Sequence, residues 1–150
     1  MGLFNITKTY TTSFPKQEAK ERLLNAEFEA SSFKYVFEEV EDNVFIANPK
    51  KEVSLYYNSF VPQIVATVLE NGDIKVEFKL TKKARFLMIF FNVDAVVLEV
   101  LILLFMLYRG AFSWIALIPC GVILFDILLS TIALRVKSND ADIEIRNLIK

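Results

Sequence analysis

Three acidic side chains lie in stretches of the sequence that are otherwise almost entirely apolar, and their chemistry could bind a proton or a cation. Residues 86–134 contain only four charged side chains: the acids Asp94, Glu99 and Asp126, and the basic Arg109. A charged group at the centre of a bilayer costs at least ~2.5 kcal/mol, so acids there call for an explanation. Neighbouring carboxyl groups raise each other's pKa and can share a proton. The three acids are therefore candidates for a proton or cation site, or for association with a second chain.

The elements that hold these acids are predicted to be two membrane-spanning helices. The apolar stretches are residues 86–108 and 111–134, and each exceeds the ~20 residues that cross a bilayer as a helix. Only Arg109 and Gly110 separate them, so the two helices must be antiparallel neighbours. Nearly every side chain around both helices is apolar, which disfavours a buried helical hairpin in a soluble protein. We assign residues 83–136 to this transmembrane hairpin.

Basic side chains gather at the outer ends of the hairpin, and we refer to them as the basic collar. The collar consists of Lys79, Lys82, Lys83, Arg85, Arg135 and Lys137. Because basic flanks stay in the cytoplasm, the sequence predicts a multi-pass cell-membrane protein with both termini cytoplasmic. The collar would also attract anionic lipid headgroups at ~1 kcal/mol per charge, although membrane topology alone explains it.

The number of residues between each acid and the turn predicts how deep that acid lies in the membrane. If the hairpin folds at its two-residue turn, residues at equal depth have numbers that sum to 219 or 220. Asp94 and Asp126 would then share one level near the cytoplasmic surface, and Glu99 would lie deeper, opposite Cys120. No basic residue of the chain lies at that depth, so the acids must be protonated, hydrated, bound to a cation or paired with another chain. A non-functional explanation is also open, in which water and headgroups reach the shallow acids and self-association accommodates Glu99.

Residues 1–82 mix charged and apolar side chains, as a soluble α+β domain does. A first strand around Phe4, Ile6 and Tyr10 is followed by a helix over residues 17–28. Further strand-like runs cover residues 33–38, 44–47, 53–57, 64–69 and 74–80. The Asn71-Gly72 pair before the last run is a strong signal for a type I′ hairpin turn. The order predicts a β-α unit followed by an antiparallel β meander with the helix packed on one face.

The C-terminal residues 137–150 have the pattern of a short amphipathic helix. Ser138 is a candidate N-cap, acids follow in the first turn, and Ala141, Ile145 and Leu148 recur at helical spacing. A strand, a helix, a run of antiparallel strands and a terminal helix is the order of helix-grip domains, in which a curved sheet wraps the last helix. Such a domain either encloses an apolar ligand or has a packed core.

Composition excludes several classes of function. The formal net charge of −1 argues against nucleic acid, which requires a basic face. With no histidine and a single cysteine, Cys120, the usual zinc sites, histidine-based catalysis and an internal disulfide are ruled out. We expect no catalytic residue, no metal site and no cofactor. An enzyme is the weakest interpretation, because acids such as Glu38, Glu39 and Glu41 fall in a turn region where solvation is their natural role.

A segment just before the hairpin resembles a group of known proteins. Residues 56–62, Tyr-Tyr-Asn-Ser-Phe-Val-Pro, are similar to the Tyr-Arg-Asn-Ser-Phe-Leu-Pro stretch of a loose group of small bacterial membrane proteins with no assigned function. Those proteins also have a strand-rich N-terminal domain and two transmembrane helices, and the likeness covers residues 30–135. The identical residues are Tyr56, Asn58, Ser59, Phe60 and Pro62.

The departures from that group limit what the resemblance implies. Tyr57 replaces the arginine, and residues 82–84 stand where the group tends to have a His-Pro pair at the membrane entry. The polar pair Asn58 and Ser59 also suits a turn, and Pro62 suits the end of strand pairing. The resemblance therefore implies an architecture rather than an activity.

The sequence supports two functions of different kinds. In the first, the chain is a non-enzymatic membrane protein whose cytoplasmic domain binds a ligand, a lipid or a protein partner, with the hairpin as anchor and assembly surface. In the alternative, several copies, or one copy with a larger partner, form a proton- or cation-conducting or transport assembly that uses Asp94, Glu99 and Asp126. The expected partners are membrane lipids and either a second copy of the chain or a second membrane protein.

Overall fold

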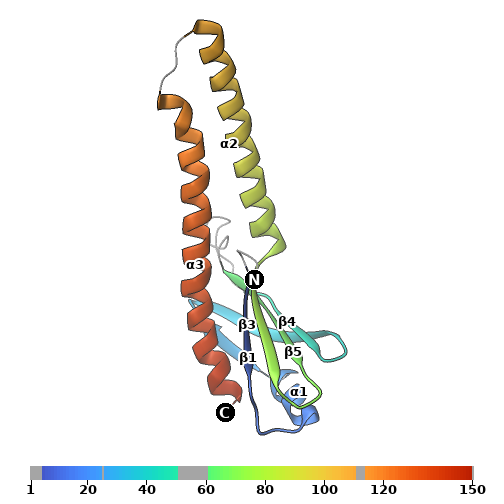
Figure 1. The fold of residues 1–150 in the computed structure, drawn as a ribbon. Helices are drawn as coiled ribbons and strands as arrows, with labels where there is room; N and C mark the ends of the chain where they lie inside the picture. The colour runs from blue at the N-terminus through green and yellow to red at the C-terminus, as the bar shows by residue number, and fades with distance from the viewer. Residues whose placement is uncertain (1–4, 25, 51–60, 111–113, 150) are drawn as a thin grey trace.

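A computed structural model describes residues 5–24, 26–50, 61–110 and 114–149. It consists of a sheet domain from which two long helices extend together to one side (Figure 1). The strands are β1 (Asn5–Tyr10), β2 (Glu27–Ala30), β3 (Phe33–Glu41), β4 (Val44–Ala47), β5 (Pro62–Val68) and β6 (Ile74–Leu80). The helices are α1 (Lys16–Leu24), α2 (Lys82–Arg109) and α3 (Ile118–Ile149), with a short 3₁₀ turn at Trp114–Leu117.

The six described strands form one antiparallel sheet in the order β1-β6-β5-β4-β3-β2. The first strand therefore pairs with the last, with Asn5 opposite Lys79 and Tyr10 opposite Ile74. Every second side chain along β5 and β6 is buried on the same face, and in β6 apolar and polar residues alternate with this burial. This confirms the predicted α+β domain with an antiparallel meander. The strand predicted over residues 53–57 lies outside the described residues.

The helix predicted over residues 17–28 ends earlier, and its last part is a strand. α1 ends at Leu24, and β2 pairs with β3 so that Ala30 lies opposite Phe33. Within β2, Phe28 and Ala30 are buried whereas Glu27 and Glu29 are exposed, which is the two-residue period of a strand. The ring of Phe28 stacks on Tyr35 with centroids 5.1 Å apart. Tertiary pairing thus overrides the helical spacing that the sequence suggested.

Asn71 and Gly72 lie in a hairpin as predicted, but the turn is not type I′. The strands close at the pair Val68 and Ile74, so residues 69–73 form a longer loop. Gly72 has φ +87°, whereas the described non-glycine residues with positive φ do not include Asn71. A type I′ turn requires positive φ at both central residues. Among the described residues, Ser31 and Ser32 between β2 and β3 have positive φ at both central positions of a turn, 52° and 65°.

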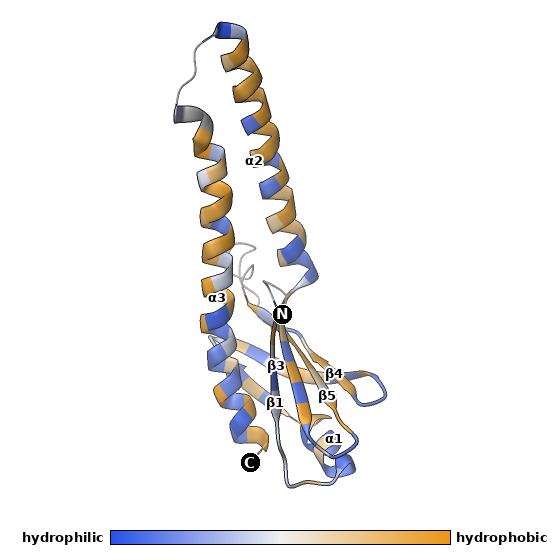
Figure 2. Cartoon of the chain, viewed as in Figure 1, coloured by the Kyte–Doolittle hydropathy of each residue, from blue (hydrophilic) through white to orange (hydrophobic). Residues whose placement is uncertain are grey.

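The helical hairpin begins directly after the sheet. The side chain of Thr81 accepts a hydrogen bond from the Ala84 amide at 3.2 Å and so caps α2 at its first turn. At the far end Gly110 closes α2 in the left-handed conformation, at the predicted position. The second long helix, predicted to begin at residue 111, begins instead at Ile118, after the 3₁₀ turn at Trp114–Leu117. α2 and α3 are both long and apolar enough to cross a membrane. Figure 2 shows apolar residues running along both helices away from the sheet domain.

The C-terminal residues are helical as predicted, but they are not a separate helix. α3 continues without a break from the hairpin to Ile149. Its last part contacts β1 and β2, which are the two edge strands, as well as β5 and β6. A sheet whose two edges touch one helix must curl around it, and this is the helix-grip arrangement that the element order suggested. Ala141, Ile145 and Ile149 belong to the core of the sheet domain.

The core under α3 is filled with large side chains. Tyr35, Phe37, Phe45 and Phe78 are all at most 2% exposed. The cavity described between α1 and the end of α3 has a volume of about 10 Å³, which is room for about one water molecule. The sequence left open whether this domain encloses an apolar ligand or has a packed core. The described residues at this position fit a packed core and leave no room for a lipid chain.

Candidate functional site

Glu99 and Asp126 lie on the contact face between the two hairpin helices. The partly buried residues of α2 include Asn92, Ala95, Glu99 and Ile102, which recur at alternating steps of three and four. This spacing places them on one stripe, and that stripe faces α3. Glu99 accepts a hydrogen bond from Cys120 Sγ, at 2.9 Å to Oε1 and 3.0 Å to Oε2. Glu99 therefore lies opposite Cys120, as the residue numbering predicts.

The two shallower acids are not brought together. Asp126 Oδ2 accepts a 3.4 Å hydrogen bond from Asn92 Nδ2, so an amide rather than a carboxyl group faces it. Asp94 is exposed on α2 and has no hydrogen-bond or ion-pair partner among the described residues. Because each residue turns a helix by 100°, Asp94 lies well off the stripe that contains Asn92 and Glu99. It points away from α3, where lipid or another chain would meet it.

The basic collar divides into exposed and engaged members. The exposed members at the junction of the sheet domain and the hairpin are Lys82, Lys83, Arg85 and Arg135. Lys79 Nζ is instead 2.5 Å from Glu77 Oε2, and hydrogen bonds from Lys75 and then Lys79 lower the pKa of Glu77 to about 2. Lys137 is half-buried 5.8 Å from the centroid of the Phe33 ring, and burial lowers its pKa.

The turn motif Asn58, Ser59 and Phe60 lies outside the described residues, and only Pro62 is placed. Pro62 is the first residue of β5 and is fully buried. Its carbonyl accepts a 3.1 Å hydrogen bond from the Tyr35 hydroxyl, and burial raises the pKa of Tyr35. No group of three or more metal-ligating side chains lies close together within the described ranges. Pro62 thus begins β5, paired with Leu80, and the turn interpretation of the rest of the motif stays a prediction.

A charged cluster that the sequence did not reveal joins β1 to the end of α3. At its centre is Asp142 of α3, whose side chain is only 4% exposed. Asp142 Oδ2 lies 2.8 Å from Lys8 Nζ and 3.2 Å from Arg146 Nε, and the Tyr10 hydroxyl donates to Oδ1. Both carboxylate oxygens are therefore occupied by donors. The guanidinium of Arg146 also lies near the Tyr10 ring, 5.9 Å from its centroid.

The electrostatics of the cluster keep Asp142 charged and Tyr10 neutral. Burial alone would raise the pKa of Asp142, but hydrogen bonds from Lys8 and Tyr10 and the charges of Lys8 and Arg146 outweigh it, so the pKa lies below its usual value. Burial, followed by the hydrogen bond to Asp142, raises the pKa of Tyr10. The cluster contains two cations and one anion, so it has a net positive charge.

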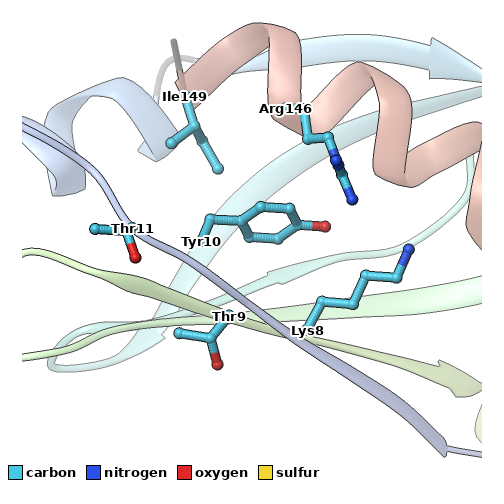
Figure 3. A pocket seen from close by; sticks show the side chains of 6 residues that line it. All are labelled: Lys8, Thr9, Tyr10, Thr11, Arg146 and Ile149. Atoms are coloured by element: carbon cyan, nitrogen blue, oxygen red, sulfur yellow. The ribbon is translucent and has the colours of Figure 1, made fainter.

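An open cleft lies beside this cluster. It has a volume of about 500 Å³ and is lined by Lys8, Thr9, Tyr10, Thr11, Arg146 and Ile149. Figure 3 shows the polar tips of Lys8, Tyr10 and Arg146 converging at one end, with Ile149 and Thr11 at the other. The volume is within the ~300–1,000 Å³ that is typical of small-molecule sites. One end of the cleft thus offers charged and phenolic donors, and the other end offers the apolar side chain of Ile149 beside Thr11.

The local sequence contains only part of the signal for this site. Lys8 and Tyr10 are two residues apart and so share one face of a strand, and Asp142 and Arg146 are four apart on one helix face. Nothing local brings the two pairs together, because Tyr10 and Asp142 are separated by 132 positions along the chain. Their meeting depends on the helix-grip arrangement, in which α3 returns to the first strand.

Comparisons with known proteins assign neither a family nor a function to the chain. No protein-family model matches the chain, no curated protein is significantly similar to it, and no solved structure matches it. The function of the chain must therefore be inferred from its own residues.

Proposed function

We propose that this chain is a non-enzymatic membrane protein whose hairpin anchors a cytoplasmic binding domain, and that the domain binds its ligand or partner in the cleft between β1 and α3. One observation carries the proposal: α3 is a single helix that begins in the apolar hairpin and ends in the core of the sheet domain. A continuous helix is stiff, so the cleft is held at a fixed height and orientation above the membrane.

The exposed part of the basic collar supports a cytoplasmic location for the domain. Four exposed cations lie where the hairpin leaves the sheet domain, against Arg109 at the opposite end of α2. The positive-inside rule then puts both ends of the hairpin in the cytoplasm. Anionic headgroups of that leaflet would pair with the collar. Lys79 and Lys137 contribute less to such pairing, because each is engaged with the sheet domain.

The charged cluster supports binding rather than catalysis. A general base needs a pKa near the working pH. Asp142 has donors on both oxygens and a lowered pKa, and the raised pKa of Tyr10 keeps its hydroxyl protonated. Neither group is poised to transfer a proton. Groups held in fixed protonation states are suited to recognising a ligand by charge and hydrogen bonding.

The outer face of the hairpin is proposed as the assembly surface. Asp94 is exposed on it, without a partner among the described residues, at a depth where charge is costly. Contact with a second copy of the chain would let two carboxyl groups share a proton. Cross-linking at low expression should show a dimer for the wild type and its loss in Asp94→Leu. Glu99→Gln serves as control and should keep the dimer, because Glu99 faces α3.

The alternative function, a proton- or cation-conducting or transport assembly, has one observation in its favour. Glu99 and Asp126 both lie between α2 and α3 rather than on the outer face. Against it, each has a hydrogen-bond donor within the same hairpin. Proton and cation flux into proteoliposomes discriminates the two functions. Conduction requires flux that Glu99→Gln and Asp126→Asn abolish, whereas an anchor gives no flux above protein-free vesicles.

Native mass spectrometry of the full chain in nanodiscs tests the proposed binding function. The wild type, purified gently from membranes, should carry a discrete non-covalent ligand or partner. Arg146→Gln should lose that added mass, because Arg146 lines the cleft. Lys50→Gln removes the same charge from an exposed site on the same domain and should keep it. An added mass that survives Arg146→Gln, or a folded wild type with none, would contradict the proposal.

A further inference from the structure

We propose that the cleft binds a soluble organic anion, in which a carboxylate or phosphate group is joined to a small apolar body. The inference rests on the proposed function, because it names the chemical class of ligand for the same cleft. It follows from the number of hydrogen-bond donors at the polar end of the cleft, from the shape of the cleft, and from its distance from the membrane.

Donors outnumber acceptors at the polar end of the cleft. An ammonium has three N–H donors, a guanidinium has five and a phenol has one, whereas a carboxylate accepts through two oxygens. Lys8, Arg146 and Tyr10 all converge on the single carboxylate of Asp142. The side chains of Lys8 and Arg146 are 33% and 57% exposed, so part of each cation faces the solvent of the cleft. The unused donors and the net positive charge favour an anion.

Asp142 has a clear role in such a site. Without it, the two cations at the polar end of the cleft would repel each other, and the end of α3 would lose its polar contact with β1. Its charge compensates for only one of the two cations. Asp142 therefore orients Lys8 and Arg146 while leaving one positive charge uncompensated. Guanidinium groups bind carboxylate and phosphate with paired, charge-assisted hydrogen bonds, which are stronger than neutral ones.

The shape of the cleft points to an organic anion rather than a bare inorganic one. Ile149 and the ring of Tyr10 line the cleft together with the cations. In Figure 3 Ile149 lies at the end opposite the polar tips. A volume of about 500 Å³ exceeds what a phosphate ion alone would fill. An anionic group at one end and an apolar group at the other would match both parts of the lining.

The ligand should come from the aqueous phase and not from the membrane that holds the hairpin. Arg146 lies eleven residues beyond Arg135 on the same helix, which is about 16 Å at 1.5 Å per residue. Screening in salt acts over about 8 Å, so the surface charge of the membrane is largely screened at this distance. A headgroup in that bilayer cannot reach the cleft, whereas a dissolved carboxylate or phosphate ester can.

Calorimetric titration of the full chain in zwitterionic nanodiscs tests the inference with phenyl phosphate as probe. Benzyl alcohol has the same ring without the charge and should not bind. Arg146→Lys keeps the positive charge but loses the guanidinium fork, and should weaken binding roughly tenfold. Lys50→Gln, distant from the cleft in an exposed ion pair with Glu38, should leave the affinity unchanged.

Asp142→Asn provides the sharpest comparison, because it keeps an amide oxygen that can still accept from Lys8 or Arg146 and removes the charge that competes with the ligand. It removes the competing carboxylate and raises the net charge of the cluster, so phenyl phosphate should bind more tightly in the folded fraction even though the domain is less stable. Weaker binding in Asp142→Asn, or equal binding of phenyl phosphate and benzyl alcohol, would overturn the inference. Equal binding would leave the proposed binding function intact, whereas failure of both probes together with no retained native ligand would overturn that function as well.

A second set of nanodiscs separates the two sources of the anionic group. In nanodiscs that contain anionic phosphatidylglycerol, phenyl phosphate should still bind, with an affinity within about twofold of that in zwitterionic ones once salt is matched. Loss of binding in the anionic nanodiscs would mean that lipid headgroups occupy the cleft. That outcome would overturn the soluble source.

Discussion

Replacing Ile145 by alanine tests whether the end of α3 is part of the core of the sheet domain, on which the proposed function depends. Ile145 is 0% exposed, whereas Ile143, two residues away on the same helix, is 50% exposed. Truncating a fully buried isoleucine to alanine costs about 2–5 kcal/mol in unfolding free energy. Truncating a half-exposed one away from the core should cost under about 1 kcal/mol.

Pulse proteolysis in urea measures the difference on the full chain in nanodiscs. With a urea dependence of about 1–2 kcal/mol per molar for a domain of this size, Ile145→Ala should lower the midpoint by about 2 M. Ile143→Ala should shift it by less than about 0.7 M. Equal shifts would refute the reasoning, because the face of α3 that meets the sheet would then be wrong. A negligible shift in both would mean that the end of α3 is not docked at all.

Three further perturbations have expected outcomes. Because the pKa of Asp142 is lower in the folded state than in the unfolded state, the charged carboxylate stabilises the fold at pH values above the unfolded pKa. This stability is lost as the pH falls through the folded pKa, so Asp142→Asn should flatten the acid limb of a curve of unfolding free energy against pH. Gly72→Ala should cost at least about 1–3 kcal/mol, because φ is +87° and a Cβ would lie 2.4 Å from a backbone oxygen, whereas Gly121→Ala should be near neutral in the same urea assay. Ser32→Gly should raise the free energy of unfolding by up to about 1 kcal/mol in the same assay, since Ser32 has φ +65° beside Ser31 in a type I′ turn.

The parts of the fold that the sequence predicted are those with a local signal. Helix α2 ends at Arg109 because Gly110 can adopt the left-handed conformation that closes the helix. The position of Glu99 opposite Cys120 follows from counting residues on either side of the end of α2, although α3 begins only at Ile118. Strict alternation predicted β6, whose buried and partly exposed residues alternate along its whole length.

The parts that were missed depend on contacts between distant segments. The predicted helix extends to Phe28, whereas the pairing of Phe28 with β3 and its stacking on Tyr35 make it a strand residue. The turn that joins β2 to β3 is built from two serines, which carry little sequence signal for positive φ. Asp142 looked like an acid of a first helical turn, because a separate C-terminal helix was expected. In the continuous α3 it is an interior residue that faces β1.

A single face of α3 links the two parts of the molecule. Ser130 and Leu134 are buried in the half of the helix that extends from the sheet domain, and Ser138, Ala141 and Ile145 are buried in the half near the sheet. Successive steps along this series are three or four residues, so all five lie on one side of the helix. Asp126 precedes Ser130 by one turn on the same side and meets α2. Docking the end of α3 on the sheet therefore fixes the rotation of the whole helix, and with it the residues that α3 presents to α2.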